Sequence, residues 1–502
     1  MKESNSKKNL ELEVKDFGPV SEAKISLKPM TVFIGSSNTG KSYLAVLIYA
    51  LHKVFNLTHP YRFFSLSKRI HNDENLLLSF QKLASRAQVK ESSLPEMGIE
   101  IPSAILDEIK NLISLQGYNL RQEIVRSFGI KDIKELIRFG TSRCSMVKFG
   151  IANEPDAIIH KFKIGTKESN FESRIPETFK LLFSKEGYQF YDNCNSILTE
   201  LNKFKEEERK KYTVLTAPSI DDMLWRLHLY HYPITLGPLS SPAYYLPTDR
   251  AGVLHTYRLV LSSLIKGASL ANQRPEWHSP MVSGVLADFL DNLVGIDGTS
   301  NGGKKSNLIN QAKQIERNLI QGEIKVTRSE LANYPHFKYH PEGWKSGLSL
   351  LNASSMVSEL APLVLYLRHV VEPGNVLIVE EPESHLHPAK QVEFTRQLAE
   401  LVNKGLKVII TTHSEWILEE LGNIVQRSKI KSWNGKPQNA VGISLSPDQV
   451  GAWLFKSKKR PRGSFVEEIK LDEETGLYPS GFDAVSESLY NDSVNIYNRI
   501  HK

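Results

Sequence analysis

The most constraining feature of this chain is the pattern G-x-x-x-x-G-K-S at residues 35–42. The apolar run Met30–Ile34 before it predicts a buried strand, and the mostly apolar segment Tyr43–Leu51 after it predicts a helix. A strand, a glycine-containing loop and a helix in this order form an anion cradle, because the loop N–H groups and the helix N-terminus face one centre. The sequence therefore predicts a binding site for a nucleoside triphosphate, and we expect ATP.

The side chains of this loop have separate expected tasks. The glycines let the backbone wrap closely around phosphates, Lys41 adds a mobile positive charge, and the Ser42 hydroxyl is expected on Mg²⁺. ATP and Mg²⁺ are therefore the expected cofactors. The residues expected to bind the nucleotide are Gly35, Ser36, Ser37, Asn38, Thr39, Gly40, Lys41 and Ser42.

A second group of candidate residues follows two later apolar runs. The run Val376–Glu381 predicts a buried parallel strand that ends in two carboxylates. Glu380 is suited to hold Mg²⁺ through its shell of water, and Glu381 is suited to polarise the attacking water as general base. The run Lys407–Ser414 predicts another strand, and a neutral His413 imidazole at its end can hydrogen-bond the γ-phosphate or that water. We expect Glu381, His413 and Lys41 to be catalytic.

Taken in order, these motifs resemble one family. The phosphate loop, E-E-P-E-S-H-L-H-P at 380–388 and T-T-H-S at 411–414 resemble the ABC-type ATPases of the SMC/RecF/OLD group, and Leu350–Leu360 resembles that group's signature motif. The resemblance implies an α/β fold: a P-loop NTPase with an ABC-ATPase head, whose mixed central sheet is flanked by helices, and a large, mainly helical insertion.

The resemblance also implies a composite site. In this family two heads pair head to tail, so that each ATP lies between one phosphate loop and the partner's signature. Ser354 and Ser355 would then act in trans at the start of a helix, and the loop around His385 would cross the dimer interface. The chain departs from the group at Met356, where the signature usually carries glycine, and at Glu380, where aspartate is more general. An ordinary amphipathic helix over 356–371 is the alternative interpretation of the signature segment.

The motifs and the composition between them predict a discontinuous head. We expect residues 1–51 and 322–430 to form the head and 52–240 to form a helical arm or lid. Residues 241–321 would return to the core, and 431–502 would form a small C-terminal β/α appendage with strands at 441–445, 452–455 and 466–471. Arg250, in L-P-T-D-R, is either a core contact near the nucleotide or an interdomain salt bridge.

Charge and composition narrow the environment and the partners. The 502 residues carry a net charge of +7, which is compatible with DNA or RNA contact. The most basic stretch, 456–462, is either such a contact or a solvated hairpin tip. No apolar run approaches the roughly 20 residues that span a bilayer, the polar N-terminus lacks the apolar core of a signal peptide, and the two cysteines lack metal-ligand spacing. We expect a cytoplasmic protein without a membrane partner.

The wording of E-E-P-E-S-H-L-H-P is most similar to OLD-like ATPases of bacterial antiphage defence, of the PARIS, Septu and Gabija types. This resemblance implies a homodimeric ATPase, converting ATP and water to ADP and phosphate, that senses infection or nucleic acid and controls a separate effector such as a nuclease. After His413 we find no D-x-D following an apolar strand, so we recognise no nuclease domain in this chain. A RecF-like ATPase of DNA repair or maintenance is the alternative function.

Overall fold

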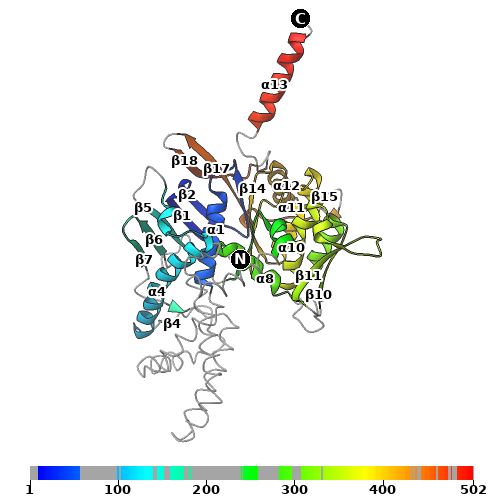
Figure 1. Cartoon of the computed structure of the whole chain (residues 1–502). Helices are drawn as coiled ribbons and strands as arrows, with labels where there is room; N and C mark the ends of the chain where they lie inside the picture. Colours follow the sequence, from blue (N-terminus) through cyan, green and yellow to red (C-terminus); the bar gives the residue numbers. More distant parts are fainter. Residues whose placement is uncertain are drawn as a thin grey trace, which may run out of the picture. The chain divides into compact units, whose positions relative to one another are not determined.

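The protein is described by a computed structural model (Figure 1). The chain divides into two compact units. The first unit comprises residues 1–13, 50–124 and 143–242, and the second comprises 14–49, 125–142 and 243–502. The structure describes residues 9–56, 99–100, 103–138, 144–151, 159–174, 180–181, 239, 241–257, 282–296, 307–329, 332–430, 432–433, 436–437, 442–459, 462–472, 476–477 and 483–500.

The second unit is built on a mixed sheet with the strand order β2-β18-β17-β3-β14-β13-β9, and residues 14–17 of β1 also belong to this unit. Its neighbouring strands β17, β3, β14, β13 and β9 run parallel to one another, while β18 is antiparallel to β17. The strands are β1 (Leu10–Phe17), β2 (Val20–Leu27), β3 (Met30–Gly35), β9 (Ala243–Leu246), β13 (Val376–Glu380), β14 (Lys407–Thr412), β17 (Val450–Lys459) and β18 (Arg462–Glu468).

Helices cover the central strands of this sheet. Every residue of β3 and of β13 is buried, which is typical of parallel strands packed on both faces. One apolar core joins these strands to the inner faces of α10, α11 and α12. The helices are α1 (Lys41–Phe55), α4 (Ser103–Phe128), α8 (Gly284–Val294), α9 (Ile309–Ile315), α10 (Ser355–His369), α11 (Pro388–Asn403), α12 (Glu415–Arg427) and α13 (Asp483–Ile500), with short helical turns at η2 (Ile133–Leu136), η4 (Glu316–Ile320), η5 (Leu350–Asn352) and η7 (Pro447–Gln449).

Smaller sheets complete the described structure. The antiparallel strands β10 (Gly322–Ser329), β11 (Ala332–Pro341) and β12 (Leu348–Ser349) form one of them. The short pairs are β4 (Ile99–Glu100) with β8 (Lys180–Leu181), and β15 (Ser432–Trp433) with β16 (Lys436–Pro437). No helix in the described ranges is both long enough and apolar enough to cross a bilayer.

Strand register decides where the predicted motifs meet. Ile34 of β3 is opposite Thr412 of β14, and Glu380 of β13 is opposite Thr411. The carboxyl ends of these parallel strands therefore lie at one edge of the sheet, where ligands of open α/β sheets bind. The predicted class, a P-loop NTPase with a mixed central sheet flanked by helices, is confirmed.

The C-terminal segment differs from the expected appendage. β17 and β18 lie inside the main sheet, because β17 pairs directly with the phosphate-loop strand and places Phe455 opposite Gly35. The strand expected at 441–445 is wrong for its described residues, 442–445, which have no regular structure. Leu445 is buried and its N–H bonds the carbonyl of Ile424, so this apolar segment anchors a connection instead of pairing as a strand.

The expectation of a mainly helical segment over 52–240 is wrong for part of the first unit. Residues 144–174 form an antiparallel meander of β5 (Cys144–Ile151), β6 (Ile159–Gly165) and β7 (Ser169–Arg174). In β5 and β6 every second side chain is buried, which is the period of a strand with one solvated face. The helical expectations for 57–98 and 182–238 lie outside the described residues.

Candidate functional site

The phosphate loop connects the buried strand β3 to α1 and has the backbone that its sequence requires. Gly35 and Gly40 have positive φ angles of 145° and 96°. A Cβ on Gly35 would collide with the Phe455 carbonyl, and a Cβ on Gly40 would collide with Val20. Both glycines are therefore required by a close approach of the flanking strands as well as by their φ angles.

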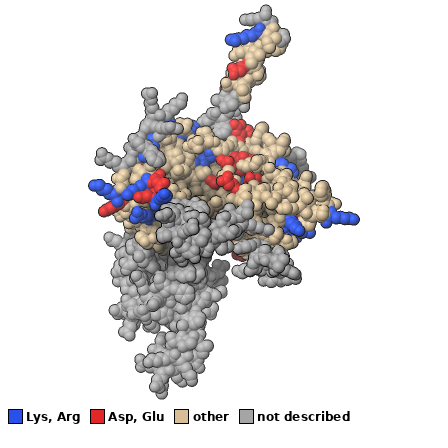
Figure 2. All heavy atoms as spheres, viewed as in Figure 1, with Lys and Arg blue, Asp and Glu red and all other residues tan. Residues whose placement is uncertain are grey.

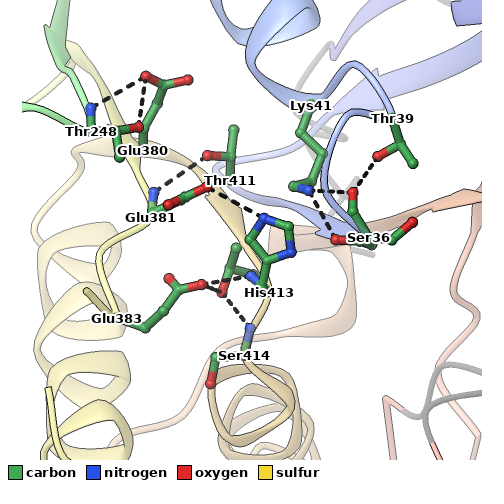
Figure 3. A network of polar contacts seen from close by, with 12 residues as sticks. Ser36, Thr39, Lys41, Thr248, Glu380, Glu381, Glu383, Thr411, His413 and Ser414 are labelled. Atoms are coloured by element: carbon green, nitrogen blue, oxygen red, sulfur yellow. Dashed lines mark hydrogen bonds and ion pairs between the residues drawn. The ribbon is translucent and has the colours of Figure 1, made fainter. Parts of the chain in front are cut away.

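Lys41 lies folded back onto its own loop. Its Nζ donates to the carbonyl oxygens of Gly35 and Ser36, both at 2.9 Å, and the Thr39 hydroxyl donates to the Ser36 carbonyl at 2.8 Å (Figure 3). Burial lowers the pKa of Lys41 from 10.5 to about 8, although the carboxylates of Glu381, Glu383 and Glu380 oppose that shift. A phosphate would replace the two carbonyls as a stronger, charged acceptor. Ser42, at the start of α1, is exposed.

Glu380 ends β13 and Glu381 follows it, and their carboxylates are directed differently (Figure 3). The Oε2 of Glu380 accepts from the backbone N–H and the hydroxyl of Thr248, at 3.4 and 3.3 Å. Its Oε1 is buried and has no hydrogen bond of regular geometry within the described part of the chain. The hydroxyl of buried Tyr245 is a donor available to this carboxylate, and the pKa of that hydroxyl is raised by burial, by the charge of Glu380 and by hydrogen bonding to Glu380. A water bound to a divalent cation would be a further partner of this carboxylate.

Glu381 turns away from the strand through a left-handed backbone, with φ of 40°. Its N–H still donates to the carbonyl of Thr411 at 2.8 Å, so the turn is anchored to β14. The carboxylate then points at His413, whose Nε2 lies 3.3 Å from Glu381 Oε1 (Figure 3). A non-glycine residue held in this region is strained, and such strain clusters at functional sites.

Glu383 has a role in this site that the sequence did not indicate. Its Oε1 accepts from the Thr412 hydroxyl at 2.7 Å and from the backbone N–H of His413 at 2.6 Å. The carboxylate therefore fixes the end of β14 and the direction of the His413 side chain. Its signal in the sequence was the third carboxylate of E-E-P-E, two residues after Glu381. Thr248, the donor to Glu380, was also missed, because only the pairing of β9 with β13 brings it there.

The signature residues lie outside this network. Ser354 is the N-cap of α10, and its hydroxyl accepts from the N–H of Val357 at 3.4 Å. Ser354 and Ser355 are exposed, whereas Met356, in the place of the expected glycine, packs against the apolar core. The contacts in Figure 3 lie in separate groups, within the phosphate loop and around Glu380, Glu381 and His413, and neither serine is among the residues labelled there.

No ready-made metal cage is formed by three or more His, Cys, Asp or Glu side chains in the described ranges. Mg²⁺ does not require one, since it keeps several waters and takes one or two carboxylates with phosphate oxygens. Ser42 and Glu380 remain the residues expected to bind such an ion.

The basic stretch 456–462 belongs to the β17–β18 hairpin, and Arg460 and Pro461 lie outside the described residues. Lys456 Nζ is 2.7 Å from a carboxylate oxygen of Glu467 on the neighbouring strand. Figure 2 shows lysines and arginines lying apart at the margins of the viewed face, with acidic side chains near its middle. No continuous basic surface is visible there among the residues drawn in colour.

Comparison with known proteins gives one family match. Residues 260–418, which are less than half of the chain, match the AAA ATPase domain family. The match contains the predicted carboxylate strand and His413 but begins after the phosphate loop. Together with the geometry of the loop, it supports an ATPase domain that binds nucleotide. No curated protein matches the chain.

Solved structures give distant similarities. An SMC head bound to the C-winged-helix domain of ScpA is 11% identical, with 93% of this chain and 98% of that chain covered and a TM-score of 0.38. The SMC head from Thermotoga maritima is 10% identical, with 92% of this chain and 99% of that chain covered and a TM-score of 0.35. The recombination mediator RecF is 10% identical, with 92% of this chain and 99% of that chain covered and a TM-score of 0.33. The fold assignment rests on the sheet order and the phosphate loop of this chain itself.

Proposed function

We propose that this chain binds ATP on residues 35–42 and hydrolyses it to ADP and phosphate. The observation that carries the proposal is the contact of 3.3 Å between His413 Nε2 and Glu381 Oε1, at the same sheet edge as Lys41. A strained carboxylate aimed at an imidazole beside a buried lysine is an arrangement for activating water next to a phosphoryl group.

Each side chain has a defined task in this proposal. Glu381 accepts the proton of the attacking water, and His413 holds the carboxylate and the water in position. Lys41 leaves the carbonyls of Gly35 and Ser36 and binds the phosphate oxygens. Mg²⁺, held by Ser42 and Glu380, would neutralise charge on the phosphates when bound.

We further propose that a second copy of the chain completes the site. Ser354 and Ser355 are exposed at the N-terminus of the 15-residue helix α10, where N–H groups and the helix dipole favour a phosphate. In the ATPases that the motifs resemble, two heads pair head to tail, so we propose that the loop of one molecule and the signature of another hold the same nucleotide. The cytoplasm, where ATP is abundant, is the proposed location.

Substitution of Glu381 by glutamine tests the ATPase proposal. The amide keeps the shape of the side chain but is a far weaker base, so we expect ATP affinity within about threefold of the unmodified chain and turnover lower by about a hundredfold or more. Calorimetry measures the affinity and phosphate release measures the turnover. Trapped with ATP, this variant should also show a dimer mass by light scattering.

Two further variants serve as controls for the Glu381→Gln measurement. Lys41→Ala should lose ATP binding, and Glu419→Gln, which makes the same chemical change at an exposed position of α12, should behave as the unmodified chain. Turnover by Glu381→Gln at the rate of Glu419→Gln would remove Glu381 as the base. A monomer mass for ATP-loaded Glu381→Gln would instead contradict only the two-copy site.

We propose that the ATPase controls a separate effector, such as a nuclease, in bacterial antiphage defence, after sensing infection or nucleic acid. The support is the likeness of E-E-P-E-S-H-L-H-P to OLD-like ATPases, together with the absence of a recognised nuclease motif in the sequence. Phage plating on cells that carry the chain with its neighbouring genes should fall, and Lys41→Ala should restore it. Equal phage plating on cells with the unmodified chain and with Lys41→Ala would contradict the defence proposal. If the Lys41→Ala cells were also more sensitive to DNA damage, the RecF-like alternative would be favoured.

A further inference from the structure

Arg250 is the largest fully buried side chain for which the catalytic proposal has no use. Its side chain is 2% exposed, in the second unit, after the turn that follows β9. Burying a guanidinium away from water is costly unless every donor is paired. The partners of Arg250 therefore indicate what the fold gains from placing it there.

The guanidinium reaches the backbone of Glu380 and Glu381. Its Nη1 donates to the Glu380 carbonyl at 2.7 Å and its Nη2 to the Glu381 carbonyl at 3.3 Å. Nη1 also donates to the Pro247 carbonyl at 3.1 Å, which ties the end of β9 to the same point. The two peptide units that set the directions of Glu380 and Glu381 thus share one planar donor.

The third nitrogen faces the helix of the signature segment. Nε donates to the Glu359 carbonyl at 3.1 Å and lies 2.9 Å from the Glu359 carboxylate. Glu359 is one turn after Ser355, and residues four apart lie on the same face of a helix. A second contact joins the same segments, since His255 Nε2 and the Ser358 hydroxyl are 3.0 Å apart.

We propose that Arg250 is a positioning residue that couples the N-terminus of α10 to the carboxylates of Glu380 and Glu381. A movement of the first turn of α10 changes the position of Glu359. The planar guanidinium of Arg250 transmits this displacement to the strained backbone of Glu381. Nucleotide contact at Ser354 and Ser355 thereby adjusts the general base. This inference rests on the proposed ATPase function and adds a means of regulating it.

Arg250→Lys tests the proposal because lysine keeps the charge but cannot span acceptors on three elements with one ammonium group. We expect ATP affinity within about threefold and turnover lower by at least about tenfold, since small misplacements at a reacting centre lower rates strongly. Amide hydrogen exchange in a peptide spanning residues 379–384 should accelerate. This readout requires no hydrolysis.

Arg368→Lys is the matched control. Arg368 lies in the last turn of α10, the helix that carries Glu359 near its start. It donates to the Ile324 carbonyl and is paired with Glu316. It should leave turnover and exchange at 379–384 unchanged. Equal effects of Arg250→Lys and Arg368→Lys would show that Arg250 supports stability only, and would overturn the proposal.

Glu359→Gln tests the coupling to α10 and is the second variant if Arg250→Lys fails to fold. It should lower turnover and accelerate exchange at 379–384 while leaving the carbonyl contacts of Arg250. Its effect and that of Arg250→Lys should be less than multiplicative in the double variant. Independent effects, or unchanged exchange in Glu359→Gln, would contradict the coupling.

Failure of the ATPase proposal can be distinguished from failure of this inference. If the unmodified chain shows no turnover that Glu381→Gln removes, the ATPase proposal fails. Hydrogen exchange at 379–384 then still decides whether Arg250 holds the backbone of Glu380 and Glu381.

Discussion

At the scale of single residues, the candidate site is assembled from groups that are unfavourable in isolation. Glu381 has a φ of 40°, Lys41 is 5% exposed, and one oxygen of Glu380 is buried without a regular hydrogen bond. Each of these costs is of the kind that bound phosphate or a cation would relieve. The geometry before binding is therefore prepared for ligands that carry the opposite charge.

The pKa of Lys41 gives a prediction at this scale. With a pKa of about 8, roughly half of the Lys41 side chains are neutral at pH 8, and a bound triphosphate must favour the charged form. ATP binding should therefore take up about half a proton at pH 8 and almost none through this group at pH 6.5. Calorimetry in buffers of different ionisation enthalpy measures this uptake.

Lys41→Arg is the control for that measurement. An arginine stays protonated throughout, so the uptake at pH 8 should disappear even where binding survives. An uptake that is the same in both proteins would place the titrating group elsewhere, for example on another side chain of the site.

At the scale of elements, the meander β5–β6–β7 shows how one buried polar group can set a pH limit. His160 of β6 stacks on Phe149 and Phe171, with ring centroids 4.9 and 5.6 Å apart. Its Nδ1 is 2.8 Å from the Ser173 hydroxyl, and burial lowers the pKa of His160 to about 3. The folded meander therefore holds this imidazole neutral.

Acid should weaken the first unit through this group. Below its usual pKa of 6.5, His160 takes up a proton in the unfolded chain but not in the folded one, so stability is lost as pH falls from 6.5 toward 3. Between pH 7 and pH 5 we expect a loss of roughly 2 kcal/mol from His160 alone. Denaturant unfolding at the two pH values, compared with His160→Phe, isolates this contribution. An identical loss in both proteins would show that His160 does not limit acid stability.

At the scale of the whole molecule, the two compact units have different relations to the proposed function. All the residues that contact one another around the phosphate loop, Glu381 and His413 belong to the second unit. The signature serines belong to it too, yet Ser354 caps its own helix. The division into head, arm, return segment and appendage remains a proposal, with β17 and β18 now assigned to the central sheet.

The sequence by itself determined the phosphate loop, the strands β13 and β14 that lead to Glu380, Glu381 and His413, and the α/β class. These features depend on local patterns: a glycine-containing loop between a buried strand and a helix, and apolar runs that end in polar groups. The meander at 144–174 was also within reach, because the apolar residues Val147, Phe149 and Ile151 occupy every second position, separated by Lys148 and Gly150, as a strand with one buried face requires.

Only the tertiary structure decided how distant segments share the site. The pairing of β9 with β13 places Thr248 and Arg250 beside residues more than a hundred positions away, and β17 enters the sheet beside β3 from the other end of the chain. Sequence periodicity indicates which face of a strand is buried, but not which strand is its neighbour. The contacts of Glu383 and Arg250 depend on that choice of neighbours, so their roles could be recognised only after the strands were placed.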